Sequence, residues 1–238
     1  MATKYLLSLL VLLLIPLAAA HSDVSDVWGQ LGIFDPILVL IAAGVVFAVG
    51  VVVAVILNHR KMNDVFRKVL FLLIAVPVVV ASIYLAGSTI YLNYASESKG
   101  PVHWHADYEI FVCREKIELV KPTGLTNRVG NPTIHEHGDS RIHIEGVLLK
   151  LKQASLHEYF ESIGGEFDGS TLGLPTEHGY MVWSNGEMCR GRPAYWAVYV
   201  NGVQLIENPD EYVIAPYGTV PPGDEIKFIF DSGGSDGS

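Results

Sequence analysis

Residues 195–206 read Tyr-Trp-Ala-Val-Tyr-Val-Asn-Gly-Val-Gln-Leu-Ile. The first half is rich in aromatic and β-branched residues, which predicts a strand over 195–200. Asn201-Gly202 is typical of a tight turn between two strands, so we expect 203–206 to return as the next strand. This hairpin predicts that a β-sheet dominates the C-terminal part of the chain.

Working outward, one helix and several further strands are expected. Ser155 can cap a helix over 155–163, because Glu158 follows three residues later and Gly164-Gly165 ends the segment. Strands are predicted at 107–112, 116–120, 141–151, 180–183 and 225–230. The sequence therefore predicts an α+β domain over 100–232, with one helix against a mixed sheet. The polar Gly/Ser tail at 233–238 is predicted to be disordered.

The N-terminal third has a different composition. Half of the 238 residues are apolar, and they concentrate at 5–19, 33–57 and 69–92. Segments 33–57 and 69–92 are long enough to cross a bilayer as helices. Residues 1–20 resemble a signal peptide, with Lys4 before an apolar core and an Ala-rich cleavage site, or form a first transmembrane helix if they are not cleaved.

The basic residues predict an orientation. The loop 58–68 holds Arg60, Lys61, Arg67 and Lys68, which is typical of the cytoplasmic side. The domain after the second span is then expected outside the cytoplasm. Neither span carries an ionisable residue near its middle, which argues against a pump or a channel. The two spans are interpreted as an anchor in the lipid bilayer.

Charge separates the two parts further. From Gly100 onwards the chain has twenty Asp and Glu residues against ten Lys and Arg. Such an acidic surface repels nucleic acid, so a nucleic-acid partner is not expected.

Five histidines form two groups in the predicted outer domain. The first is His103-Trp104-His105, and the second is His135-Glu136-His137 followed by His143. Alternate residues of an extended strand point to one face, so each His-x-His pair aims two imidazoles at one point. Imidazole suits copper and zinc. The sequence therefore predicts a transition-metal site, copper or zinc, made of His103, His105, His135, His137 and His143.

Acidic residues lie around these histidines. Asp139, Glu136 and Glu145 could accept hydrogen bonds from the ring N–H groups that do not bind the metal. If the backbone is extended through 135–145, the odd-numbered residues share one face, although Gly138 interrupts the run. Signal cleavage after residue 20 would also expose His21, whose amine and imidazole could chelate copper.

Two cysteines, Cys113 and Cys189, complete the set of candidate ligands. A single pair in an oxidising compartment favours a disulfide. A thiolate in a Cys/His copper site is the alternative.

An enzymatic interpretation also fits part of the pattern. His103-x-His105-x-x-x-Glu109 fits the first metal motif of cupins, in which a later histidine completes the site. Three ligands and a water would leave an open position for an oxygenase or a hydrolase. The sequence contains no nucleophile elbow, H-E-x-x-H motif, P-loop or haem-attachment motif.

Two resemblances follow from the motifs. The segments His103-Trp104-His105-Ala106-Asp107, His135-Glu136-His137-Gly138-Asp139 and Val198-Tyr199-Val200-Asn201-Gly202 are similar to a family of uncharacterised, largely archaeal, membrane-anchored proteins. The pattern of 198–202, 212–214 and 222–230 looks like the second half of a β-grasp fold. The second of these resemblances implies a β-grasp-like outer domain.

The sequence thus favours a membrane-anchored, extracytoplasmic metal-binding protein. Its expected partners are the bilayer and another membrane protein or a metal-accepting protein. A metal-dependent enzyme and a metal-free interaction domain on a membrane tether are the alternatives.

Overall fold

A computed structural model describes residues 27–57, 62–123, 125, 127–214 and 223–233. The chain divides into two compact units, residues 1–95 and 96–238. The expected signal segment 1–20, His21 and the tail from 234 onwards lie outside the described residues.

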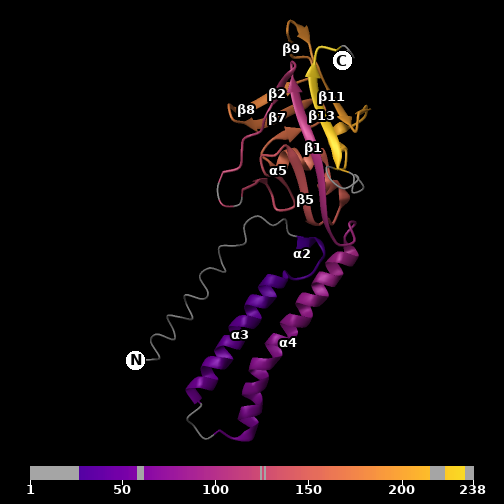
Figure 1. Cartoon of the computed structure of the whole chain (residues 1–238). Coiled ribbons are helices and arrows are strands. Elements are labelled where there is room, and N and C mark those ends of the chain that lie inside the picture. Colours follow the sequence, from indigo (N-terminus) through magenta and orange to yellow (C-terminus); the bar gives the residue numbers. More distant parts are fainter. Residues whose placement is uncertain (1–26, 58–61, 124, 126, 215–222, 234–238) are drawn as a thin grey trace. The chain divides into compact units, whose positions relative to one another are not determined.

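The first unit is a helical hairpin, whose helices are α2 Val27–Gln30, α3 Pro36–Leu57 and α4 Asp64–Ala95 (Figure 1). Both α3 and α4 are long and apolar enough to cross a membrane, by length and composition. The carboxylate of Asp35 accepts a hydrogen bond from the backbone N–H of Ile37 at 2.7 Å, as expected for a cap before Pro36. The predicted span 69–92 lies inside α4, which begins earlier because Asn63 caps it through the N–H of Phe66 at 2.8 Å.

The two long helices approach closely at Gly50. A Cβ atom at this position would lie 2.9 Å from Ile74, so only glycine fits without a shift of the neighbouring side chain. The hydroxyl of Tyr84 donates to the carbonyl oxygen of Phe34 at 2.7 Å and ties α4 to the residues just before α3. A Cβ at Gly44, by contrast, would meet nothing within 4 Å.

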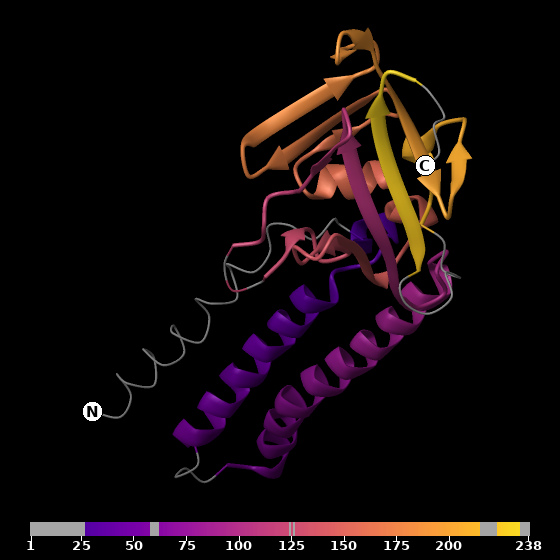
Figure 2. The same ribbon diagram turned by 45° about the horizontal axis from the view of Figure 1, so that its top comes forward.

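The second unit is built on one mixed sheet, whose strand order is β12-β11-β13-β1-β5-β4-β3, with β2 paired to β1. Strands β1 and β13 are parallel neighbours at its centre, and the other pairings are antiparallel (Figures 1 and 2). The strands of this sheet are β1 Pro101–Val112, β2 Glu115–Ile117, β3 Val129–Gly130, β4 Ile134–Glu136, β5 Arg141–Val147, β11 Tyr195–Val200, β12 Val203–Leu205 and β13 Asp224–Asp231.

The core lies between this sheet and the helix α5 Leu156–Ser162. Ser155 caps α5 as predicted, because its hydroxyl accepts the N–H of Glu158 at 3.3 Å. Phe160 of α5 contacts the buried rings of Phe167 and Phe228, with ring centroids 5.5 Å and 5.3 Å away. Two short 3-10 helices contact α5: η1 Leu151–Ala154, which directly precedes it in the chain, and η2 Pro209–Glu211, which comes much later.

A smaller sheet and a short hairpin complete the domain. The order β6-β7-β8 comprises Glu166–Phe167, Thr171–Thr176 and Gly179–Ser184, while β9 Met188–Cys189 pairs with β10 Arg192–Pro193. A disulfide joins Cys113, after β1, to Cys189 in β9. The predicted disulfide is therefore confirmed, and these sulfurs do not serve as thiolate ligands.

Three sequence predictions differ from the structure in their boundaries. Strand β1 begins at Pro101 rather than at 107, so His103 and His105 lie within the strand and not before it. Strand β2 spans Glu115–Ile117 rather than 116–120, after a turn at Cys113 and Arg114, which both have positive φ. Strand β5 ends at Val147 instead of 151, just after Gly146 at φ +96°.

Candidate metal centre

The histidines line up across three neighbouring strands. His105 in β1 is the register partner of His143 in β5, and His143 is in turn the partner of His135 in β4. Ala106, Ile142 and Ile144, which alternate with the histidines, are fully buried in the core. The imidazoles therefore project from the sheet face opposite to the core.

This alignment depends on a reversal of the chain that the sequence did not show. The odd-numbered residues from 135 to 145 were expected to share a face if the segment formed one extended run. The structure instead folds them into the antiparallel hairpin β4–β5, with Gly138 at φ +79° between the strands. The reversal places His135 directly opposite His143.

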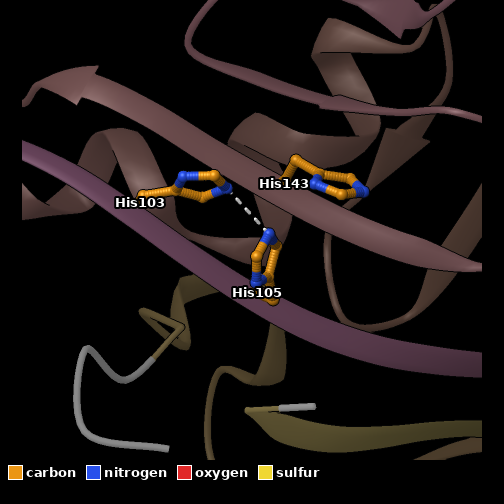
Figure 3. A group of neighbouring side chains, drawn as sticks. All are labelled: His103, His105 and His143. Carbon is orange, nitrogen blue, oxygen red and sulfur yellow. Dashed lines mark hydrogen bonds between the residues drawn. The ribbon is translucent and has the colours of Figure 1, made fainter. Parts of the chain in front are cut away.

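Three histidines meet closely enough to hold one ion (Figure 3). One ligand atom each from His103, His105 and His143 lies within 4.8 Å of the other two. The Nε2 atoms of His103 and His105 are 3.0 Å apart. Two nitrogens bound to one ion at about 2.0–2.1 Å are separated by about 2.9–3.4 Å in square-planar or tetrahedral geometry. The first His-x-His pair is therefore already spaced as two neighbouring ligands of one ion.

The second pair lies next to this group. The ring of His137 is 4.8 Å from that of His143 and 4.9 Å from that of His135, between centroids. His135 stacks on His143 at 5.7 Å with an interplanar angle of 10°. Within the described part of the chain, however, only His103, His105 and His143 form a group of three whose ligand atoms all lie within 4.8 Å of one another. All five predicted histidines are thus neighbours, but three of them form the compact group.

Hydrogen bonds fix two of the rings. Nδ1 of His137 faces the carbonyl oxygen of Asn127, which can only accept, so this nitrogen carries the proton and Nε2 is left with a free lone pair. Nε2 of His143 lies 3.3 Å from the carboxylate of Asp139. Such contacts are typical of metal-binding histidines, in which one ring nitrogen is held and the other binds the ion.

Burial and hydrogen bonding set the protonation of the site. Burial lowers the pKa of His105, and the neighbouring His143 and His103 lower it further. Burial opposes the ionisation of Asp139, but hydrogen bonds from His143 and from the backbone outweigh it and lower the pKa. Neutral imidazole beside ionised carboxylate is the state in which a metal ion binds best.

The three expected acidic neighbours behave differently. Asp139 contacts His143 as described, and Glu145 lies 3.5 Å from Nε2 of His103. Glu136 points into the core instead, where its carboxylate accepts a hydrogen bond from the hydroxyl of Tyr108 at 2.7 Å. Burial raises the pKa of Glu136. Sequence reasoning missed both this core role and the carbonyl of Asn127 that orients His137, because neither contact has a local sequence signal.

The cupin-like interpretation takes Glu109 as a metal ligand, whereas in the structure this residue forms ion pairs. Glu109 shares the outer face with His103 and His105, but its carboxylate oxygens lie 3.2 Å from Lys116 and 3.6 Å from Lys227. Of the other described histidines, His157 and His178, neither belongs to the three-histidine group. His157 bonds the carbonyl of Phe167 at 2.8 Å, and His178 is exposed after β7.

Comparison of the chain with family models, curated proteins and solved structures finds no match.

Proposed function

We propose that the second unit is an extracytoplasmic domain that binds a transition-metal ion, copper or zinc, on a membrane anchor. The observation that carries the proposal is the approach of His103, His105 and His143 within 4.8 Å of one another. These residues come from two strands whose register is set by seven consecutive pairs, so the rings do not meet by the chance placement of a loop. Imidazole nitrogen favours Cu²⁺ and Zn²⁺ over Mg²⁺ and Ca²⁺.

The exposure of the site favours capture and delivery of the ion. The side chain of His103 is 63% exposed, whereas that of His143 is 13% exposed. An ion on this face can therefore be reached by a metal-accepting partner. The excess of acidic residues in the domain attracts cations to it.

The membrane anchor is supported by α3 and α4, whose most apolar stretches have a mean hydropathy of 3.1 and 2.8. The basic residues Arg67 and Lys68 near the start of α4 favour a cytoplasmic connection between the helices. This orientation puts the histidines on the outer side, where a disulfide such as Cys113–Cys189 persists.

A β-grasp-like arrangement of the domain is part of the proposal. The sheet order β12-β11-β13-β1-β5 supports it. At its centre β1 and β13, the first and last strands of the domain along the chain, pair in parallel. The helix α5 follows β5 and covers the core face, as such an arrangement requires.

One observation favours a metal-dependent enzyme as the second candidate. Three histidines leave a coordination position open, and the carboxylate of Glu145 stands beside His103. A substrate or a water could occupy that position.

The test is metal analysis of the full-length protein purified in detergent. We expect bound copper or zinc after incubation and desalting, and a loss of at least tenfold in affinity for His105→Ala. The matched control is His178→Ala, which removes an exposed histidine outside the cluster. Equal metal content in His105→Ala and the control would refute the proposal, whereas a metal-bound water replaced by a small anion would favour the enzyme.

A further inference from the structure

The position of His143 suggests more than a single ion. It lies in β5, between β1 with its pair His103 and His105 and β4 with its histidine His135. We propose that the histidine face holds two transition-metal ions, with the imidazole of His143 as the bridging ligand between them. This inference rests on the proposed function and specifies its stoichiometry.

The two ring nitrogens of His143 point in different directions. In Figure 3 one ring nitrogen lies on the side of His103 and His105, and the other points away from them. Nε2 is the nitrogen beside Asp139, at 3.3 Å, which leaves Nδ1 for the outer group. An imidazole can bind one ion through each nitrogen, and the N–H proton that the second ion displaces is released to solvent.

The inner group has its own donors. The Nδ1 atom of His135 is buried without a hydrogen-bond partner, in a residue that is 2% exposed. His137 offers Nε2, because Asn127 holds its Nδ1. With Nε2 of His143 and the carboxylate of Asp139, the inner group has three nitrogens and one carboxylate, enough for a four-coordinate ion.

Spacing and charge also allow two ions. The outer group lies between β1 and β5 and the inner group between β5 and β4, so the ions would be about 5–6 Å apart, close to one strand spacing. Each group has one carboxylate beside it, Glu145 for the outer and Asp139 for the inner. These two negative charges and the bridging imidazolate offset the repulsion between the cations.

The two sites should fill in order. The ligand atoms of the outer group already lie within 4.8 Å of one another. Those of the inner group are farther apart, so its side chains must rotate to bring them around one ion. The outer ion therefore binds first and more tightly. The inner ion, next to the 2% exposed His135, exchanges more slowly with solvent.

The experiment titrates the full-length protein in detergent with Cu²⁺ alone, and measures copper per chain after desalting together with the electron paramagnetic resonance spectrum. We expect two ions per chain and a spectrum in which spin coupling has reduced the signal of the second ion. His137→Ala should bind one ion with an uncoupled signal, and His103→Ala should also bind one. His135→Leu, which fills the buried position with an apolar side chain, provides a second inner variant that keeps the packing.

Each outcome decides between the two claims. One ion in the wild type, retained in His137→Ala and His135→Leu, overturns the second site but leaves the proposed function standing. Two ions without spin coupling overturn the bridging role of His143. An absence of bound copper, with zinc equally absent, overturns both the second site and the proposed function. Folding of each variant is checked by near-ultraviolet circular dichroism against His178→Ala.

Discussion

Replacement of His135 by leucine should stabilise the metal-free domain and weaken the metal-bound one. In the structure His135 is 2% exposed and its Nδ1 has no hydrogen-bond partner. A buried polar atom in this state destabilises the fold by about 1–3 kcal/mol. Leucine removes that penalty. Its imperfect packing in a site of similar volume lowers the stability by less than about 1.5 kcal/mol. The net expectation is a gain of about 1 kcal/mol without metal.

With metal the sign reverses. An ion at one hundred times its dissociation constant stabilises the native state by about 2.7 kcal/mol, and the variant loses the share that depends on His135. The assay is urea unfolding of the full-length protein in detergent, followed by tryptophan fluorescence, with a chelator and then with excess Cu²⁺. His178→Ala, which changes an exposed residue, provides the baseline.

Two results would contradict this expectation for His135→Leu. If His135→Leu destabilises the chelated protein by more than about 1 kcal/mol, the histidine contributes to the fold through contacts that outweigh its unpaired nitrogen. If copper stabilises the variant as much as the wild type, His135 takes no part in binding. Either result refutes the proposal that the buried His135 ring destabilises the metal-free domain and is present because it binds a metal ion.

Three further outcomes are expected. Cys113→Ser with Cys189→Ser removes a cross-link between residues 76 positions apart, so urea unfolding should show a loss of up to about 4 kcal/mol, which reduction of the wild type should reproduce. Phe228→Ala, which truncates a fully buried ring, should lower the free energy of unfolding by about 3–5 kcal/mol in the same assay. The hydrogen bond to the carbonyl of Phe167 raises the pKa of His157, so its stabilising effect is complete below about pH 6.5 and disappears as the pH rises through the folded-state value. His157→Asn should therefore be more destabilising at pH 5.5 than at pH 8.5, by under about 1 kcal/mol for so exposed a group, and an equal effect at both pH values would contradict this assignment.

Much of the fold could be predicted because local patterns agree with the final structure. The strand at 195–200, the Asn201-Gly202 turn and the capped helix after Ser155 all have signals within a few residues, and the structure shows each of them. The pairing of Cys113 with Cys189 followed from the presence of only two cysteines. The sequence also predicted that His103 and His105 share one strand face, and both lie in β1 and belong to the three-histidine group.

The rest depends on contacts between distant residues. Strand β7 Thr171–Thr176 was missed because Gly173 and Pro175 weaken its strand signal, although it is central in its sheet. Glu136 was expected near the metal, but strand alternation turns it to the core, where Tyr108 binds it. The parallel pairing of β1 with β13, which join the two ends of the domain, has no local signature at all.

The reversal at Gly138 has the largest consequence for function. An extended run through 135–145 would have spread His135, His137 and His143 along one strand, with His135 and His143, eight residues apart, about 26 Å from each other. The observed hairpin brings His135 and His143 into register instead, with ring centroids 5.7 Å apart. A side chain at Gly138 would have to adopt φ +79° and would lie 3.0 Å from Pro122. Gly138, which left the direction of the chain through 135–145 open in the sequence, therefore allows the pairs His103/His105 and His135/His137 to meet on one face of the sheet.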